Sequence, residues 1–116
     1  MVDIVYLDDE PDLTDIFKLF FESTSHDIQV FNDEKPAIAH CIKKPPNILF
    51  VDYRLKTMTG DEVAAQINPQ VMTVLVTGDI KVESNFTFDA IIKKPFKLSE
   101  LIATVEKLSN QLNRMP

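Results

Sequence analysis

Short apolar runs alternate with segments of helical periodicity along the whole chain. Five runs have the length and composition of β-strands: Val2–Leu7, Asp27–Phe31, Ile48–Val51, Val71–Val76 and Phe88–Ile92. The run Ile48–Val51 is apolar at every position, as is typical of a central strand that is buried on both faces of a parallel sheet. The pattern therefore predicts a sheet that contains this strand in its interior.

The segments between these runs carry the spacing of amphipathic helices. Apolar residues recur at intervals of three and four after Pro11, which predicts a helix that runs to about Ser23. Three further helices are predicted at Glu34–Ile42, Asp61–Ile67 and Leu98–Leu112. The segment 81–87 has no clear period, and its sequence is a poor helix former.

Five strands that alternate with helices predict an α/β architecture. Right-handed crossovers between parallel strands place the helices on both faces of the sheet. The length of 116 residues favours one compact domain. In sheets of this kind the ligand site lies beyond the carboxyl ends of the strands, so the residues at those ends are the candidates for function.

Acidic, hydroxyl and basic side chains follow the predicted strands. Asp8 and Asp9 follow the first strand, Asp52 the third, Thr77 the fourth and Lys94 the fifth. Clustered carboxylates repel one another unless a cation neutralises them, and a small hard cation such as Mg²⁺ prefers oxygen ligands. Each residue alone has an ordinary structural explanation, but their appearance together at four strand ends favours one functional site.

Phosphoryl transfer fits this set of groups. A carboxylate that attacks phosphorus forms an acyl phosphate, which is a known covalent role for aspartate. A divalent cation would offset the developing charge, and a hydroxyl and an ammonium could hold the other phosphoryl oxygens. We therefore interpret Asp52 as the candidate acceptor, with Thr77 and Lys94 as the groups that hold the transferred oxygens.

Composition narrows the class of function. The net charge is −6 and the pI is about 4.8, which argues against nucleic-acid binding by this domain, because phosphate contacts need a basic surface. No apolar run approaches the roughly 20 residues of a membrane span, and no signal peptide is visible, so the expected location is cytoplasmic, without membrane contact. The single cysteine, Cys41, is interpreted as a packing residue.

The chain resembles the receiver domain of two-component response regulators across nearly its full length. The segments that carry this resemblance are IVYLDDEPDL at 4–13, ILFVDYRLKTMTGDEVA at 48–64, VLVTGD at 74–79 and IIKKPF at 91–96. The resemblance implies a flavodoxin-like, doubly wound α/β fold with a five-stranded parallel sheet in the order 2-1-3-4-5. It also implies a single receiver domain over residues 1–116, with no output domain in this chain.

The function implied by the resemblance is that of a phosphoacceptor in a phosphorelay. A histidine kinase or a histidine phosphotransfer protein would donate the phosphoryl group, and phosphorylation would change binding to a downstream protein. Such a domain catalyses its own phosphorylation and dephosphorylation but turns over no external substrate. The family often dimerises through the face of its fourth helix, so the resemblance also allows a homodimer.

Four residues match the catalytic and structural positions of the family's motif. Asp52 matches the phosphoacceptor, and Thr77 matches the switch hydroxyl that turns toward the phosphoryl group. Lys94 matches the lysine that pairs with this group, and the bond between Lys94 and Pro95 is expected to be cis. The resemblance therefore assigns to the same residues the roles that their chemistry suggests.

The resemblance also implies a site for Mg²⁺, or Mn²⁺. Asp9 matches the acid that binds the metal directly, and Asp8 matches the acid that assists, partly through water. Asp52 and the backbone carbonyl of Arg54 match the remaining protein ligands. The side chains of Arg54 and Asp79, two residues after Asp52 and Thr77, match positions that tune hydrolysis of the acyl phosphate. We expect these opposite charges to meet across the site and hinder water.

The chain departs from the family's pattern at four places. Ile91 stands where the family usually has the aromatic residue that swings inward as the switch hydroxyl moves. Only 16 residues, 78–93, separate Thr77 from Lys94, so the fourth helix is expected to be short or remodelled. Asn68-Pro69 is expected to truncate the third helix, and Lys56 replaces a common proline.

Three other functions compete with this interpretation. A degenerate receiver would act as an interaction module without phosphorylation, but the complete set of acids, Thr77 and Lys94 argues against it. An aspartyl-phosphate hydrolase usually has a second Asp two residues after the first as its acid/base, and position 54 is Arg. A flavodoxin would need a phosphate-binding loop after the first strand, where Asp8 and Asp9 would repel the phosphate.

Overall fold

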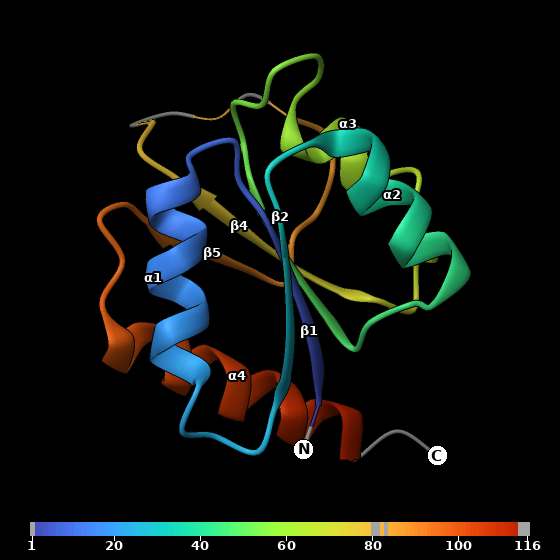
Figure 1. Ribbon diagram of the computed structural model, residues 1–116. Helices are drawn as coiled ribbons and strands as arrows, with labels where there is room; N and C mark the ends of the chain where they lie inside the picture. Colours follow the sequence, from blue (N-terminus) through green and yellow to red (C-terminus); the bar gives the residue numbers. More distant parts are fainter. Residues whose placement is uncertain (1, 80–81, 83, 114–116) are drawn as a thin grey trace.

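Five parallel strands form one sheet in the computed structural model, which describes residues 2–79, 82 and 84–113 (Figure 1). The strands are β1 (Asp3–Leu7), β2 (Asp27–Phe31), β3 (Ile48–Asp52), β4 (Met72–Thr77) and β5 (Ala90–Lys93). Their order across the sheet is β2-β1-β3-β4-β5. The predicted fold class and strand order are therefore confirmed. The three inner strands, β1, β3 and β4, lie between the two edge strands.

Helices cover both faces of the sheet. The described residues form α1 (Pro11–Phe21), α2 (Glu34–Lys43), α3 (Gly60–Ala64) and α4 (Leu98–Asn113). Helices α1 and α4 pack on one face, and α2 and α3 pack on the other (Figure 1). Among the described residues, none of these helices combines the length and apolar character needed to cross a bilayer.

The short helix α3 shows how local sequence sets its bounds. The Glu62 carboxylate accepts a hydrogen bond from the Thr59 backbone N–H at 3.0 Å, which satisfies a donor at the helix start. Gln66 and Ile67 then make the tighter i→i−3 bonds that end a helix, at 3.0 and 3.2 Å. The helix therefore stops at Ala64, earlier than the predicted Ile67, although the predicted truncation is present.

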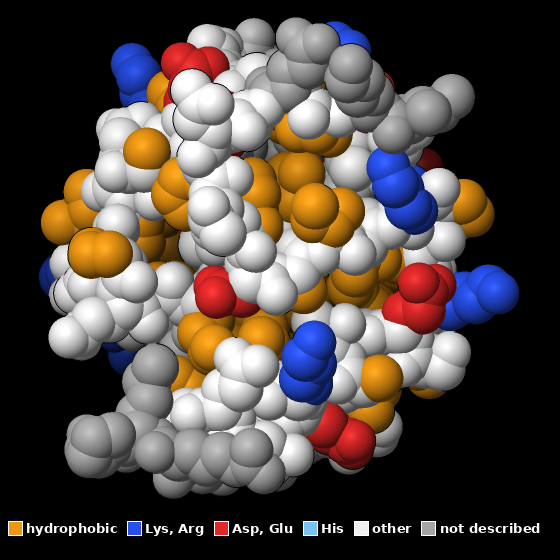
Figure 2. Space-filling model, turned by 180° about the vertical axis from the view of Figure 1, so that it is seen from behind, with side chains coloured by type: hydrophobic (Ala, Val, Ile, Leu, Met, Phe, Trp, Pro, Cys, Tyr) orange, Lys and Arg blue, Asp and Glu red, His pale blue; other side chains and the backbone are white. Residues whose placement is uncertain are grey.

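The connection between β4 and β5 contains no helix among its described residues, 78–79, 82 and 84–89. Val82 and Phe88 still pack partly against the core beneath α2 and α3, and the rings of Phe86 and Phe88 lie 4.8 Å apart. Residues 80, 81 and 83 of this segment lie outside the described residues. Figure 2 shows the molecule from behind, with hydrophobic side chains reaching the surface between charged groups.

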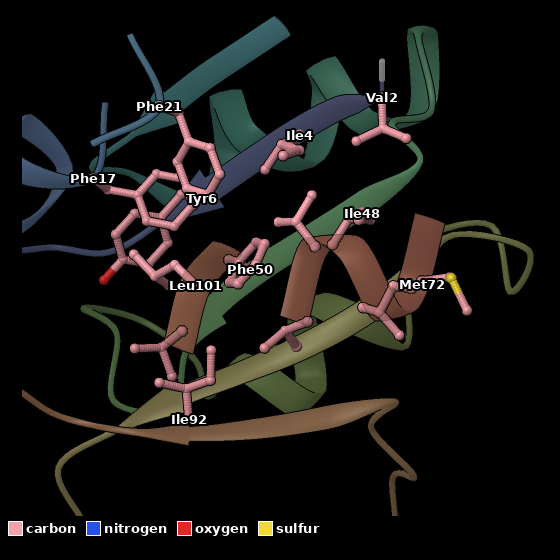
Figure 3. Packing of buried hydrophobic residues seen from close by; sticks show 14 residues of the cluster. Val2, Ile4, Tyr6, Phe17, Phe21, Ile48, Phe50, Met72, Ile92 and Leu101 are labelled. Carbon is pink, nitrogen blue, oxygen red and sulfur yellow. The ribbon is translucent and has the colours of Figure 1, made fainter. Parts of the chain in front are cut away.

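Each face of the sheet has its own hydrophobic core. Alternate strand residues, such as Tyr6 and Phe50, pack with Phe17 of α1 beneath α1 and α4 (Figure 3). The intervening strand residues pack beneath α2 and α3, where Cys41 is fully buried, as expected of a packing residue. Burial of one large apolar side chain contributes about 1.5–3 kcal/mol, so two such cores hold the strand ends in a fixed arrangement.

Candidate functional site

The loops that follow β1, β3, β4 and β5 meet at the carboxyl edge of the sheet. They surround an open depression of about 290 Å³. The residues that line it are Asp9, Glu10, Asp52, Arg54, Thr77, Gly78, Asp79 and Lys94. The structure therefore brings the acids, the hydroxyl and the ammonium that sequence analysis placed at the strand ends into one site.

Asp52 ends β3 and has only 5% of its surface exposed. One of its carboxylate oxygens, Oδ1, lies 3.3 Å from the Lys94 ammonium nitrogen. Burial, followed by the charge of Asp8, raises the pKa of Asp52 to about 6, and the nearby Lys94 limits this rise. At neutral pH the carboxylate is therefore mostly ionised, although it has lost most of its hydration.

Lys94 bridges two buried acids. Its Nζ lies 2.8 Å from Asp8 Oδ2 and 3.3 Å from Asp52 Oδ1. Burial alone would lower the pKa of Lys94, but the hydrogen bond and charge of Asp8 and the charge of Asp52 outweigh it, so the pKa is raised. The ammonium therefore stays charged. The peptide bond between Lys94 and Pro95 is cis.

Asp8 is fully buried and is held by donors on both of its carboxylate oxygens. The Glu10 backbone N–H donates to Oδ1 at 3.0 Å. The Tyr6 hydroxyl donates to Oδ2 at 2.5 Å, and Lys94 contacts the same oxygen. Burial, followed by the charge of Asp8, raises the pKa of Tyr6 above its ordinary value, so the hydroxyl keeps its proton. Sequence analysis did not single out Tyr6.

The acids after β1 form a group that suits a divalent cation. Carboxylate oxygens of Asp8, Asp9 and Glu10 lie within 4.8 Å of one another, and Asp9 shares the depression with Asp52. All of these donors are oxygens, which a small hard cation such as Mg²⁺ prefers. The residues present therefore fit the predicted metal. Glu10 belongs to this group, although sequence analysis did not place it among the ligands.

Thr77 is buried at the end of β4, and its hydroxyl takes part in a local turn. The Asp79 backbone N–H donates to Thr77 Oγ1 at 3.0 Å. The Lys94 backbone N–H donates to the Thr77 carbonyl at 2.8 Å, which ties the ends of β4 and β5 together. Thr77 and Lys94 are therefore linked through the backbone as well as through the depression that both line.

Arg54 and Asp79 meet at the mouth of the depression. Arg54 Nε donates to Asp79 Oδ1 at 3.0 Å and to Oδ2 at 2.9 Å. The Arg54 side chain is 77% exposed and that of Asp79 is 24% exposed, so solvent reaches the pair. The Lys93 ammonium also donates to the Asp79 carbonyl at 2.8 Å. The pair connects the loop after β3 with the segment after β4.

The loop after β3 is held in its middle and at its carboxyl end. Gly60 begins α3 directly behind Asp52, because a Cβ on Gly60 would lie 2.3 Å from the Asp52 carbonyl oxygen. The buried Glu34 of α2 accepts hydrogen bonds from the Thr57 backbone N–H, at 2.9 Å, and from the Thr57 hydroxyl. The nearby Lys56 forms an ion pair with Asp33 at 2.8 Å. These contacts position the loop that carries Arg54.

Ile91 lies outside the depression. It belongs to β5, where it pairs in register with Leu75, and it is 59% exposed. The side chain therefore stands at the surface of the sheet's edge, on the strand that leads to Lys94.

Comparison with known proteins identifies the class to which this site belongs. The sequence model of the response regulator receiver domain family matches residues 4–106. Response regulator ArlR of Staphylococcus epidermidis is 25% identical over 123 residues, covering 100% of this chain and 55% of ArlR. Transcriptional regulatory protein TrcR of Mycobacterium tuberculosis is 29% identical, covering 90% of this chain and 44% of TrcR. The chain thus spans about half the length of these relatives.

Solved structures show the same fold. A CheY-like response regulator receiver domain from Methanospirillum hungatei superposes with a TM-score of 0.88 at 24% identity, covering 97% of this chain and 98% of that chain. Response regulator TrrA of Thermotoga maritima, in complex with Mg²⁺ and BeF, superposes with a TM-score of 0.82 at 23% identity, covering 93% and 99% of the two chains.

The chain belongs to the response regulator receiver domain family. It is a receiver domain of two-component signal transduction, a class of signalling domains that interact with histidine kinases and bind Mg²⁺ through an acidic pocket. In this chain Asp8, Asp9 and Glu10 form an acidic cluster at the edge of the sheet.

Proposed function

We propose that Asp52 accepts a phosphoryl group from a phosphohistidine, carried by a histidine kinase or a histidine phosphotransfer protein. The observation that carries this proposal is the Lys94 ammonium, which lies 3.3 Å from Asp52 Oδ1 and can pair with the oxygens of an arriving phosphoryl group. Thr77 lines the same depression and supplies a hydroxyl for another of these oxygens. The domain thereby switches partner interactions and turns over no external substrate.

The transfer is a single displacement at phosphorus. A carboxylate oxygen of Asp52 forms a bond to phosphorus while the bond from phosphorus to the donor's ring nitrogen breaks. The electron pair of the broken bond returns to that nitrogen, and the donor leaves as neutral imidazole because its other ring nitrogen already carries a proton. Burial of Asp52 removes competing water, and its raised pKa of about 6 still leaves the attacking oxygen ionised at neutral pH.

A divalent cation completes the proposed site. Asp9, Asp52, the Arg54 backbone carbonyl and Asp8, partly through water, would hold Mg²⁺, or Mn²⁺, which would offset the charge of the phosphoryl oxygens. The oxygen donors grouped at the end of β1 support this assignment. TrrA, a structural relative of this chain, is in complex with Mg²⁺ and BeF.

Arg54 and Asp79 are proposed to slow the loss of the phosphoryl group. Their contact spans the mouth of the depression, between the loop after β3 and the segment after β4. A pair in this position narrows the path by which water reaches the acyl phosphate. The stability of the pair is modest, because exposed ion pairs contribute only about 0–1 kcal/mol.

The signal is proposed to leave through the segment after β4. If Thr77 turns toward the phosphoryl group, its Oγ1 loses the hydrogen bond from the Asp79 N–H, which opens the turn formed by Thr77, Gly78 and Asp79. Ile91 has no ring or hydroxyl with which to follow Thr77 inward, and it is 59% exposed. The usual relay through an aromatic residue is therefore replaced by movement of the segment itself.

Residues 1–116 are proposed to act as a single receiver domain in the cytoplasm. Its partners would be a phosphohistidine protein and a downstream protein, with a homodimer as a further assembly, and without nucleic acid or membrane contact. The acidic net charge of −6 supports the exclusion of nucleic acid from this domain.

Labelling with a small phosphodonor such as acetyl phosphate tests the proposed function. The wild-type domain should incorporate one phosphoryl group per chain when Mg²⁺ is present and none when it is chelated. Asp52→Asn should abolish incorporation, whereas Asp27→Asn, at the exposed start of β2, should retain it. Labelling of Asp52→Asn at the wild-type level would refute the assignment of Asp52.

A further inference from the structure

Tyr6 is a buried polar residue that the proposed chemistry leaves without a role. It lies on β1 and is 0% exposed, with its ring centroid 4.5 Å from that of Phe17 and 6.2 Å from that of Phe96. Figure 3 shows the ring packed beside Phe17 and Phe21, with its hydroxyl at the margin of the hydrophobic core. The aromatic packing fixes the direction of this hydroxyl, which donates to Asp8 Oδ2 at 2.5 Å.

The oxygen that accepts this bond is shared with Lys94. Lys94 Nζ lies 2.8 Å from Asp8 Oδ2, closer than its 3.3 Å contact with Asp52. Under the proposed function, the ammonium must pair with a phosphoryl group on Asp52. Its contact with Asp8 would then weaken or break, because one ammonium cannot keep its best geometry with both groups.

Asp8 cannot turn to solvent for compensation, because it is 0% exposed. A buried carboxylate that loses a hydrogen-bond donor is strongly destabilised, and bonds to charged groups are among the strongest in proteins. Two protein donors to the Asp8 carboxylate would remain besides the proposed metal and its water, namely the Glu10 N–H on Oδ1 and the Tyr6 hydroxyl on Oδ2. Of these, the Tyr6 hydroxyl occupies the oxygen from which Lys94 departs.

We propose that Tyr6 is a positioning residue that holds Asp8 in place and satisfies its Oδ2 when Lys94 moves to the phosphoryl group. This inference rests on the proposed function of Asp52. The effect of Tyr6 is therefore selective for one state of the site. Its hydroxyl stabilises Asp8 only slightly while Lys94 contacts Asp8, and it stabilises Asp8 most when a phosphoryl group is on Asp52.

Tyr6→Phe tests this selectivity, because it removes the hydroxyl and leaves the ring. The affinity for Mg²⁺ alone and for beryllofluoride in the presence of Mg²⁺ would be measured by calorimetry. We expect the variant to bind beryllofluoride about tenfold more weakly and Mg²⁺ within about twofold of wild type. Val105→Ala is the control for a general loss of packing, since it lies on α4 in the same hydrophobic core and leaves the rings around Tyr6 in place, and it should leave both affinities unchanged.

Equal losses of both affinities in Tyr6→Phe, or no loss of either, would overturn the inference. A wild-type domain that fails to bind beryllofluoride would instead refute the proposed function, so the two failures are distinguishable. A second measurement needs no variant. The Tyr6 hydroxyl proton, followed by NMR in the wild-type domain, should stay protected from exchange when beryllofluoride binds. Loss of this protection would also overturn the inference.

Discussion

Arg54 Nε donates to both carboxylate oxygens of Asp79, at 3.0 and 2.9 Å, across the mouth of the depression that contains Asp52. The two residues are 25 positions apart in the chain and come from different strand ends. Their contact therefore depends on the fold, and removal of either side chain should open the same path for water.

Arg54→Ala should shorten the lifetime of the phosphorylated domain by about two- to fivefold, in line with the ~0–1 kcal/mol that an exposed pair contributes. The measurement is the loss of phosphoryl label after removal of the donor. Lys56→Ala removes another exposed basic side chain from the same loop, one that pairs with Asp33 instead, and should leave the lifetime unchanged. An unaltered lifetime in Arg54→Ala would show that the pair does not hinder water.

Asp52→Asn should stabilise the metal-free domain at high pH. The folded-state pKa of Asp52, about 6, lies above the ordinary value of 3.8, so the folded state binds the proton more tightly than the unfolded state. The associated stability is fully present below about pH 4 and is lost as the pH rises through 6. We expect the variant to raise the free energy of unfolding by about 1–3 kcal/mol at pH 8.

The pH profile of this difference is the decisive measurement. Urea unfolding in the presence of a chelator should give a gain for Asp52→Asn at pH 8 that shrinks toward pH 4. Asp27→Asn, at the exposed start of β2, should show no such trend. A gain that is constant across this range would mean that burial does not raise the pKa of Asp52.

Gly60→Ala should destabilise the fold by about 1–3 kcal/mol, because the new methyl group would overlap the Asp52 carbonyl oxygen at 2.3 Å. Gly78→Ala is the matched control. Its nearest heavy atom would be Lys94 Cβ at 4.0 Å, which is an ordinary contact, so this variant should unfold at nearly the wild-type urea concentration. Equal stability of the two variants would contradict the close packing behind Asp52.

Glu34→Gln should weaken the anchor of the loop after β3. Hydrogen bonds from Thr57 outweigh burial and lower the pKa of Glu34, so its contribution is present above the ordinary value of 4.5 and is lost as the pH falls. We expect a loss of about 1–2 kcal/mol at pH 7 that diminishes below pH 4.5. Thermal or urea unfolding measures it, and a loss that persists unchanged at low pH would argue for a purely steric role.

Sequence patterns were sufficient for the alternation of strands and helices and for the convergence of Asp52, Thr77 and Lys94, because both follow from hydrophobic periodicity and the geometry of parallel sheets. The strand order came from the resemblance to receiver domains. The bond between Tyr6 and Asp8 was not foreseeable in this way. A tyrosine inside an apolar strand is predicted to be a core residue. Only the orientation of the ring in the structure shows that the Tyr6 hydroxyl reaches Asp8 at the end of the strand.

Side-chain contacts between segments far apart in the chain also could not be predicted from the sequence. Glu34 begins a helix, where an acid is ordinary, and nothing in its local sequence identifies Thr57 as its partner, 23 residues away. By contrast, the expected meeting of Arg54 and Asp79 came from the resemblance, which places both positions beside the acyl phosphate, and from their opposite charges. Sequence reasoning succeeded where the sheet dictates proximity and failed where side-chain rotamers decide it.

The strand β5 lies at the edge of the sheet, has four residues and leads directly into Lys94 and the cis Pro95. An edge strand has unpaired backbone groups with which a strand of another chain can pair. A short edge strand, lysine side chains and proline all oppose such pairing. Ile91 is exposed on this strand, and its apolar side chain would otherwise favour association with another chain. The short β5, with Lys93 at its end and Pro95 just beyond it, therefore opposes pairing of a further strand along this open edge.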